Sequence, residues 1–236
     1  MSEVGNGSAR GFLLFLLLLA LAAAALLRGW VEIPPRWNPW APLDLGEPPN
    51  FLSGFKMARL RDDPRRCLQA LETSQLRFDP VADSLPAPGC PLENSVRLRS
   101  SDTLALGGDF LASCPLAAAF ALFEEHGLQP AADAVYGQPV VRIEHYGSFA
   151  CRNIGGSSRR SQHASANALD IAGFRLRDGT RITLARDWNG SEREQRFLRQ
   201  VRDAACGPFN AVLGPEYNAA HHDHLHLDMG TFRICR

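Results

Sequence analysis

Apolar side chains recur with a helical period in two stretches of the chain. Residues 113–128 (SCPLAAAFALFEEHGL) are apolar at most positions, which predicts a buried helix with Ser113 as its N-cap and Gly127 as its stop. Residues 53–75 also show helical spacing. We expect that helix to be interrupted at Pro64, because proline inside a helix removes a backbone donor.

The pattern changes to a period of two further along the chain. Residues 139–149 (PVVRIEHYGSF) alternate and contain β-branched side chains, which predicts a strand. Residues 168–184 (ALDIAGFRLRDGTRITL) have the pattern of a β-hairpin, in which Asp178 and Gly179 would supply the positive φ angles of a two-residue turn.

A further helix is predicted between this hairpin and the end of the chain. Residues 191–206 are amphipathic, and Ser191 is followed three residues later by Glu194, which is the signature of a capping box. Helices first, then a hairpin, a helix and a strand predict an α+β fold, with an antiparallel sheet and flanking helices.

The last predicted strand lies in HHDHLHLDMG, residues 221–230, which hold four of the chain's 7 histidines. Alternate side chains of a strand point to opposite sides, so His224, His226 and Asp228 would share one face. That face could bind a metal ion, since histidine is the commonest metal ligand, or it could be a polar face turned to water.

A second polar cluster occurs in SQHASANALD, where His163 precedes Asp170. Asp170 would lie on the face of its strand opposite Leu169 and Ile171. Aspartate is depleted in strands and costly to bury without a partner, so its position favours a bound cation. Catalytic zinc takes three protein ligands and keeps one position for water, so His163, Asp170 and one histidine of the last strand form a candidate zinc site.

An uncharged apolar run, GFLLFLLLLALAAAALL, occupies residues 11–27. It is close to the length of about 20 residues that spans a bilayer, and it lacks the polar stripe of a surface helix. A retained transmembrane signal anchor over residues 11–30 is favoured over a cleaved signal peptide, which the Ala-x-Ala sites inside the run keep as the alternative. Residues 1–10 would then be a short cytoplasmic N-terminus.

The rest of the chain is expected outside the membrane. Residues 31–50 are rich in Pro and Trp and predict a linker, which places the folded domain at 51–236. All 6 cysteines follow the apolar run without a CxxC pair, which favours three disulfides in an oxidising compartment over buried free thiols. Two of them, Cys151 and Cys206, are expected to flank the candidate site.

Charge excludes one class of partner. Lys plus Arg and Asp plus Glu number 25 each, so the chain lacks the basic excess typical of nucleic-acid binding, and no nucleic-acid partner is expected. The 236 residues are 45% hydrophobic, which is enough for one sizeable core. No pattern indicates an oligomeric state.

Four segments, YGSFACRN, SQHASANALDIAGF, VLGPEYN and HHDHLHLDMG, strongly resemble the extensin-like C-terminal domain proteins of bacteria, and WNPWAPLDL extends this resemblance over nearly the whole exported part. More distantly, S-x-H-x-x-G-x-A-x-D followed by H-x-H is similar to the superfamily of lysostaphin, the D-Ala-D-Ala metallopeptidases and sonic hedgehog. Its members bind zinc and mostly cleave peptidoglycan peptides. An ordinary extensin is excluded, because the chain has no Ser-Pro repeats.

The distant resemblance implies roles for single residues. His163, Asp170 and His226 would be the Zn²⁺ ligands. Ser161 matches the first motif and would contact the substrate. Arg152 lies in a segment similar to the S-G-Y-R-S stretch of the D-Ala-D-Ala enzymes, and it would face the substrate carboxylate or, alternatively, form a structural salt bridge.

The chain departs from the superfamily pattern at two positions. The motif glycine is Ala166, and the Glu of the E-x-x-H variant is Asp223. Asp223 and His224 are equal candidates for the catalytic base, with Glu216 as a third. The other histidines are expected to be exposed or behind the ligands (His221, His222) or structural (His126, His145).

Two functions follow from these patterns. In the first, a membrane-anchored zinc peptidase of the D,D-carboxypeptidase or endopeptidase kind acts on peptidoglycan peptides, and the metal activates a water molecule. In the second, the same domain holds zinc structurally or binds a wall polymer without cleaving it. Both make the chain a single-pass protein of the inner membrane, with its C-terminal domain in the periplasm or outside and a cell-wall polymer as partner.

Overall fold

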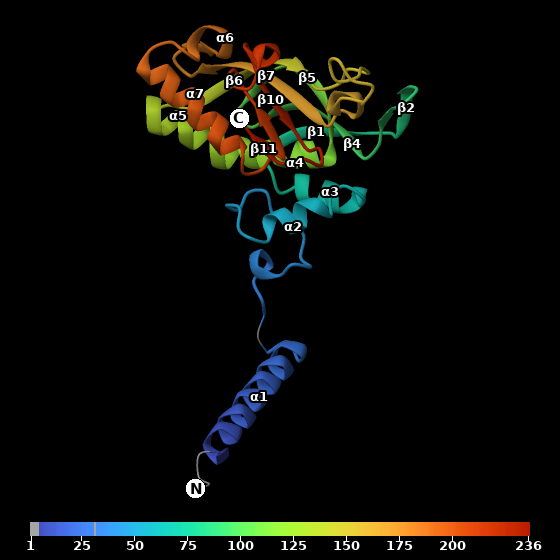
Figure 1. The fold of residues 1–236 in the computed structure, drawn as a ribbon, viewed down its shortest axis with the longest axis vertical. Helices are drawn as coiled ribbons and strands as arrows, with labels where there is room; N and C mark the ends of the chain where they lie inside the picture. Colours follow the sequence, from blue (N-terminus) through green and yellow to red (C-terminus); the bar gives the residue numbers. More distant parts are fainter. Residues whose placement is uncertain (1–4, 31) are drawn as a thin grey trace. The chain divides into compact units, whose positions relative to one another are not determined.

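The structure is a computed structural model that describes residues 5–30 and 32–236 (Figure 1). The first residues of the predicted cytoplasmic segment, 1–4, and Val31 at the start of the predicted linker lie outside the described residues. The chain forms two compact units, residues 1–41 and residues 42–236.

The first unit contains helix α1 (Gly5–Leu27) and the short 3-10 helix η1 (Pro35–Trp37). The segment Ala9–Leu26 has a mean hydropathy of 2.3. Within the described residues, α1 is the one helix long and apolar enough to cross a membrane, and a signal sequence would have the same properties. The choice between a retained anchor and a cleaved signal stays a prediction.

The second unit begins before the boundary expected at residue 51. Leu43 and Leu45 are buried in the core, and the Leu45 N–H donates to Thr73 Oγ1 at 2.8 Å. The compact unit therefore begins at Pro42, because the end of the Pro-rich segment packs against the domain.

Helices α2 (Ser53–Ala58) and α3 (Pro64–Leu71) confirm the predicted interruption at the proline. Pro64 is tolerated in the first turn of α3, where its missing N–H has no helical partner. The Asp63 carboxylate accepts hydrogen bonds from the backbone N–H groups of Arg65 and Arg66, and so caps the new helix.

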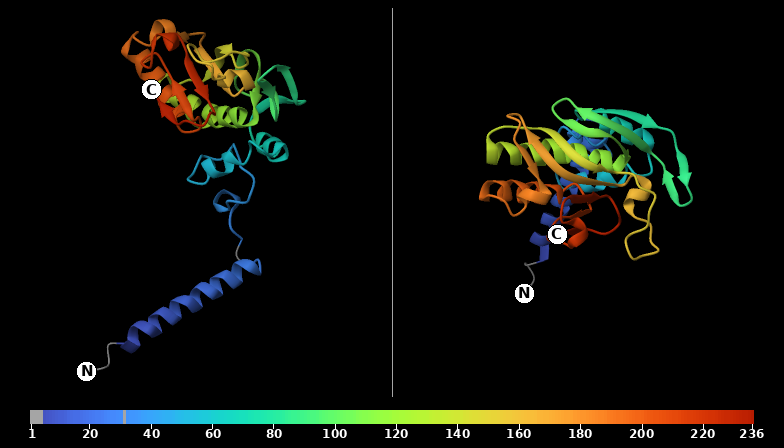
Figure 2. Two further views of the ribbon diagram at one scale, coloured as in Figure 1. Left: turned by 45° about the vertical axis from the view of Figure 1, so that its right-hand side comes forward. Right: turned by 90° about the horizontal axis from the view of Figure 1, so that it is seen from above.

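A large sheet fills the second unit, as the views in Figure 2 show. Nine of the strands found in the described residues form it, in the order β1-β4-β5-β6-β7-β10-β9-β11 with β8 paired to β7. The strands are β1 (Leu76–Val81), β4 (Ser95–Ser101), β5 (Ala105–Ser113), β6 (Val140–Gly147), β7 (Ala168–Leu176), β8 (Arg181–Thr183), β9 (Ala211–Leu213), β10 (Leu225–Asp228) and β11 (Ile234–Cys235). A small hairpin, β2 (Ser84–Ala87) and β3 (Cys90–Leu92), stands apart from this sheet.

The sheet is mixed, which corrects the expectation of an antiparallel one. Most pairs are antiparallel, but β5 pairs with β6, and β9 with β11, in parallel. The reason is a helical crossover: the chain leaves β5, runs through helices, and returns as β6 in the same direction. The α+β class is confirmed.

The crossover is longer than the helix predicted to stop at Gly127. Helix α4 (Cys114–Phe123) continues through a π-helical turn, η2 (Glu124–Leu128), into α5 (Gln129–Tyr136). The stop is Gly137, which has φ +67°. Gly127 instead permits a close helix contact, since a Cβ there would stand 3.0 Å from the Ala204 Cβ.

Local signals near the later elements are mostly confirmed. Ser113 caps α4 and Ser191 forms the predicted capping box with Glu194 at the start of α7 (Glu192–Ala205), which follows the short α6 (Leu184–Asp187). The turn between β7 and β8 is different from the prediction. The register pairs Arg175 with Arg181, and Gly179 alone takes a positive φ there, so the loop is longer than two residues.

The core lies between one face of the sheet and the helices. All residues of α4 are buried, and the Phe110 ring of β5 meets Phe120 of α4 with centroids 5.8 Å apart. On β7, the Phe174 ring packs on Phe197 of α7 at 5.5 Å. The opposite face of the sheet carries polar side chains.

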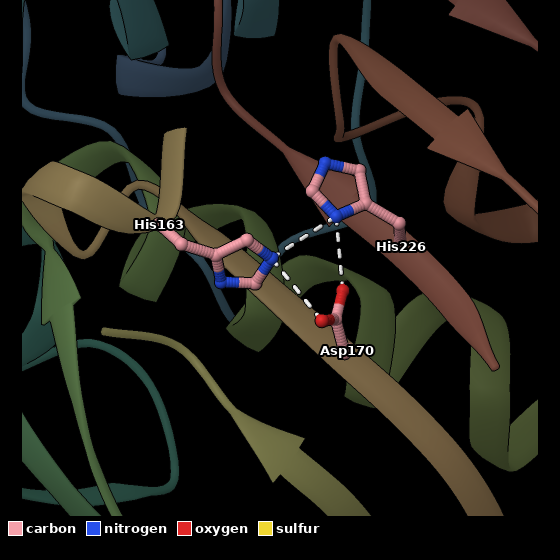
Figure 3. A group of neighbouring side chains, drawn as sticks. All are labelled: His163, Asp170 and His226. Atoms are coloured by element: carbon pink, nitrogen blue, oxygen red, sulfur yellow. Dashed lines mark hydrogen bonds and ion pairs between the residues drawn. The ribbon is translucent and has the colours of Figure 1, made fainter. Parts of the chain in front are cut away.

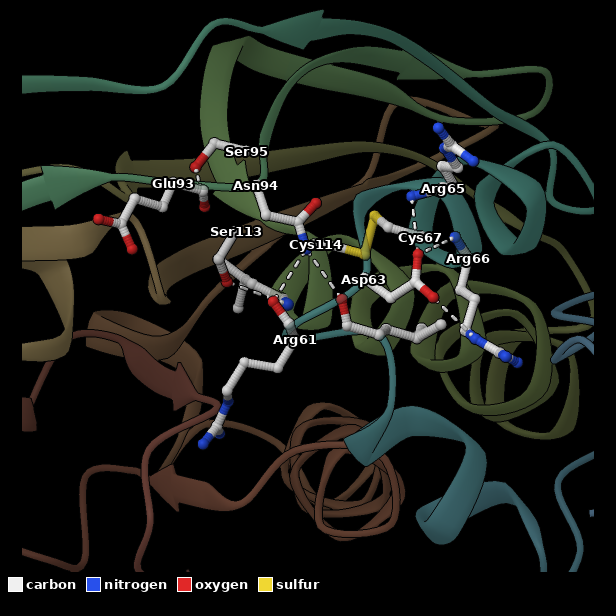
Figure 4. The surroundings of a disulfide bond; sticks show 12 residues. Arg61, Asp63, Arg65, Arg66, Cys67, Glu93, Asn94, Ser95, Ser113 and Cys114 are labelled. Atoms are coloured by element: carbon white, nitrogen blue, oxygen red, sulfur yellow. Dashed lines mark hydrogen bonds and ion pairs between the residues drawn. A yellow bond between two sulfur atoms is a disulfide. The ribbon is translucent and has the colours of Figure 1, made fainter. Parts of the chain in front are cut away.

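The three predicted disulfides are present. They join Cys67 to Cys114, Cys90 to Cys151 and Cys206 to Cys235. Figure 4 shows the first, which ties α3 to the start of α4. Beside it, Asn94 Nδ2 donates to the carbonyl groups of Leu60 and Arg61 at 2.8 and 3.0 Å, so the segment between α2 and α3 is held to the sheet.

Candidate metal centre

The three predicted ligands, His163, Asp170 and His226, converge on the polar face of the sheet (Figure 3). His163 Nε2 lies 3.2 Å from Asp170 Oδ2 and 3.2 Å from His226 Nδ1, and His226 Nδ1 lies 2.9 Å from Asp170 Oδ1. One ligand atom from each residue lies within 4.8 Å of the others. His163 is almost fully buried, and the other two side chains are partly buried.

Strand register places two of these residues. Asp170 of β7 and His226 of β10 are direct partners in an antiparallel pair. Their neighbours Leu169 and Ile171, and likewise Leu225, are fully buried on the core side. The period of two therefore turns the carboxylate and the imidazole to the same open face.

A tight turn places the third ligand. His163 lies in the 3-10 helix η3 (Gln162–Ser165), whose N-cap is Ser161. Ser161 is buried, and its hydroxyl accepts a hydrogen bond from the His163 N–H at 3.3 Å. The turn ends at Ala166, which has φ +50°, in the left-handed region that favours glycine. Ser161 thus positions His163, and its contact with a substrate stays a prediction.

Each imidazole is oriented by an acceptor behind it. His163 Nδ1 lies 3.1 Å from the Ser148 carbonyl oxygen, and His226 Nε2 lies 3.1 Å from Asp228 Oδ2. Asp228 is itself held by the Gly230 N–H, which donates to Oδ1 at 2.7 Å. Histidine ligands of metals usually donate their outer N–H to such groups, which fixes the tautomer and the ring orientation.

The electrostatics of the cluster favour a positive charge among its carboxylates. Burial raises the pKa of Asp170, but hydrogen bonds from His163 and His226 outweigh burial and lower this pKa well below its usual range. Burial lowers the pKa of His226, but Asp170 and Asp228 outweigh it and raise the pKa to about 9. The site therefore stabilises a proton on His226, and a divalent cation would take its place.

The donor set fits a zinc ion. Tetrahedral zinc with ligands at about 2.0–2.2 Å requires donor atoms roughly 3.3–3.5 Å apart. His163 Nε2 and His226 Nδ1 are 3.2 Å apart, and they approach different oxygens of Asp170, Oδ2 at 3.2 Å and Oδ1 at 2.9 Å, so a tetrahedral ion would require the carboxylate to turn and the three residues to move slightly apart. Two imidazoles and a carboxylate are also a known donor set for catalytic zinc, which keeps its fourth position open.

A second group of side chains borders the ligands. His224 Nε2 lies 3.6 Å from Asp170 Oδ1, and His224 Nδ1 lies 2.8 Å from Asp223 Oδ1. The Tyr146 hydroxyl donates to Asp223 Oδ2 at 3.2 Å, and the Tyr146 ring meets the His224 ring edge-on at 5.7 Å. Both oxygens of Asp223 are thus engaged, and His224 is the nearer of the two base candidates to the ligands.

His221 and Arg152 stand on the same side of the sheet. The His221 ring centroid is 5.3 Å from that of His224 and 5.7 Å from that of His226. Burial first, then the charges of His226 and His224, and more weakly that of Arg152, lower the pKa of His221 to about 4. Arg152 is exposed, and its guanidinium forms no ion pair with any residue that the structure describes.

The other candidate residues of the sequence analysis form hydrogen bonds or ion pairs away from the candidate ligands. Glu216 pairs with Arg199 at 3.2 Å and with Arg202 at 3.1 Å, so both of its oxygens face α7. The remaining histidines bind main-chain carbonyl groups: His126 that of Leu45, His145 that of Gly108 and His222 that of Ala219.

Sequence reasoning missed the parts that Asp228 and Tyr146 take in this cluster. Asp228 was expected on the shared face but without a role, and Tyr146 was not expected beside the candidate ligands. For His221, a place behind the ligands was one of two expectations. The alternation of Arg142, Glu144 and Tyr146 along β6 was a signal for Tyr146, because it places these residues on one face. His221 carries no such signal, since it lies in a turn outside the strand.

Comparison with known proteins identifies the chain. The family model described as "Extensin-like protein C-terminus" matches residues 65–236. The chain belongs to this family. The match covers every site residue named above, so the candidate centre lies wholly within the extensin-like domain. No curated protein and no solved structure matches the chain.

Proposed function

We propose that this extensin-like protein is an exported zinc-dependent peptidase that acts on the peptides of cell-wall peptidoglycan. Helix α1 would hold it in the inner membrane as a single-pass protein, with the second unit in the periplasm or outside. The observation that carries the proposal is the convergence of His163, Asp170 and His226, with an outer acceptor behind each imidazole.

The sequence pattern supports the same function. The spacing of Ser161, His163, Ala168 and Asp170, followed by His226, resembles the zinc-binding motifs of the lysostaphin and D-Ala-D-Ala metallopeptidase superfamily. Disulfides support an exported location, because they persist in oxidising compartments.

Side chains around the ligands have complementary tasks in this proposal. Bound zinc would supply Lewis-acid polarisation and lower the pKa of a water molecule. His224 would accept the proton of that water, because Asp223 holds its Nδ1 and leaves Nε2 facing the ligands. Arg152, which has no carboxylate partner among the described residues, would bind the substrate carboxylate.

Digestion of purified sacculi tests the proposal. The full chain in detergent is incubated with sacculi, and the released fragments are examined by mass spectrometry. New peptide ends are expected from the unmodified protein and are lost in His224→Ala, while His222→Ala serves as the matched control. Protein that pellets with unaltered sacculi would instead favour the second function, a wall-binding domain without turnover.

A further inference from the structure

Three arginines gather on the polar face of the sheet, beyond the candidate metal centre. They are Arg142 of β6, Arg175 of β7 and Arg181 of β8, and they surround Glu144 in a shallow hollow. We propose that this hollow, the arginine basin, binds a carboxylate of an extended substrate chain whose other end reaches His163, Asp170 and His226. The identity of the substrate as a wall peptide rests on the proposed function.

The charges of the basin are incompletely neutralised. Arg181 donates to both oxygens of Glu144 through Nε, at 2.8 and 2.9 Å, so the one carboxylate of the basin is largely committed to this arginine. Arg175 Nη2 is 3.6 Å from Glu144 Oε1, beyond a good hydrogen bond. Arg142 is exposed and forms no ion pair with any residue in the described part of the chain.

These contacts leave room for an anion. The basin is lined by three arginines, one glutamate and His145, so its net charge is +2 when the histidine is counted as neutral. Arg175 and Arg181 keep 44% and 52% of their side-chain surface exposed, so their guanidinium groups remain accessible. A guanidinium that is not already engaged binds a carboxylate through paired N–H donors. A carboxylate on the substrate would pair with the guanidinium groups that Glu144 leaves without a close partner.

Gly107 of β5 also lines the basin. A Cβ at this position would stand 3.3 Å from the Ile143 carbonyl oxygen and 3.5 Å from the Glu144 Cα. Gly107 therefore lets β6, the strand that carries Arg142 and Glu144, lie close to β5.

A continuous strand face joins the basin to the metal centre. Arg142, Glu144 and Tyr146 alternate along β6, and Tyr146 contacts His224 at the centre. Arg142 pairs with Arg175 and Gly147 pairs with Asp170, and the register between these two pairs shifts on both sides of His145. About four regular strand residues, or about 13 Å, therefore separate the basin from Asp170. About four residues of an extended peptide span that distance at about 3.3–3.6 Å each. The inference is a substrate carboxylate roughly four residues from the bond that reacts.

Pelleting with purified sacculi tests the inference on the full chain in detergent. R142Q/R175Q removes two charges from the basin, and the matched control R65Q/R196Q removes two from exposed positions on α3 and α7. Sacculi are used untreated, with their carboxylates amidated, and after hydrofluoric acid has stripped phosphate-linked polymers. Zinc content, melting temperature and released fragments are measured on the same preparations.

The basin variant should bind untreated sacculi at least tenfold more weakly than wild type, with zinc content and melting temperature unchanged. The control pair should bind normally, amidation should abolish binding, and hydrofluoric acid should leave it intact. Wild-type affinity in R142Q/R175Q, binding that survives amidation or disappears with the phosphate polymers, or no binding by the wild type would overturn the inference. If the arginine effect persists while the protein holds no zinc and releases no fragments, the peptidase proposal alone fails.

Discussion

His226 and Asp170 face each other directly across β10 and β7, with His226 Nδ1 2.9 Å from Asp170 Oδ1. The pair comes from segments 56 residues apart in the sequence. Their strands are fixed by buried neighbours, so the sheet holds the imidazole and the carboxylate together before any ligand binds. Preorganisation of this kind lowers the cost of assembling a metal site on binding.

Asp228→Asn tests the acceptor behind His226. The amide can still accept from the Gly230 N–H, but it removes the carboxylate that lies 3.1 Å from His226 Nε2. We expect zinc affinity to fall by about 10–100-fold with the fold retained. Competition with a chelator measures the affinity, and Asp203→Asn at the exposed end of α7 is the control. Equal affinities in wild type and Asp228→Asn would show that this carboxylate does not support the ligand.

Periodicity predicted the positions of the candidate ligands better than the positions of the residues around them. The alternation around Asp170 and His226 places both side chains opposite buried residues, and the structure has them there. The register that makes them partners is a long-range property of packing, which neither segment contains alone. Asp228 and Tyr146 could not be assigned for this reason, since their roles depend on which segments become neighbours.

The first part of the sheet was harder to predict than the second. Strand β1 contains Pro80 and β5 contains Gly107 and Gly108, residues that are depleted in strands. Pro80 and Gly107 are each tolerated for a local reason. Strand β1 lies at the edge of the sheet, where a missing N–H is harmless, and Gly107 lets β6 approach closely. Without β5, the parallel pairing with β6 could not be foreseen.

Gly127→Ala tests the close contact of the crossover with α7. The new Cβ would stand 3.0 Å from the Ala204 Cβ, so the helices must separate, at a cost of about 1–3 kcal/mol. That cost should outweigh the gain in helix propensity of about 1 kcal/mol. Gly54→Ala in α2 is the control, because nothing lies within 4 Å of its Cβ position. Chemical denaturation should show Gly127→Ala less stable than wild type, and the reverse order of the two variants would refute the contact.

Glu124→Gln tests a buried carboxyl group outside the metal centre. Burial is the main cause that raises the pKa of Glu124, while hydrogen bonds from Ser101 and Thr103 oppose it. Because the folded-state pKa is raised, wild-type stability should decline as pH rises from about 4.3, where an unfolded glutamate ionises. Glutamine keeps the acceptor without the charge, so the variant should be more stable at pH 7 and less dependent on pH. Melting temperatures of the wild type and the variant, measured between about pH 4 and pH 7, test this prediction, and Glu125→Gln is the control.

Removal of the Cys90–Cys151 disulfide, by replacing both residues with alanine, should destabilise the domain. The bond closes a loop over a sequence separation of 61, and a native bridge typically contributes about 2–4 kcal/mol. Cys151 lies between Ala150 and Arg152 in the sequence. The Ala150 N–H donates to the His163 carbonyl oxygen at 3.0 Å. The melting temperature should fall by several degrees. An unchanged melting temperature would mean that the segment around Arg152 is held without the bridge.

Metal analysis of the purified full chain tests the central claim most directly. We predict about one zinc per chain in the wild type, as in mononuclear catalytic sites. His163→Ala, Asp170→Ala and His226→Ala should each abolish tight binding, whereas His224→Ala should keep the metal. His222→Ala should match the wild type. A wild-type protein that carries no zinc and gains no thermal stability when zinc is added would contradict the account, and so would a His224→Ala variant that loses zinc as completely as His226→Ala.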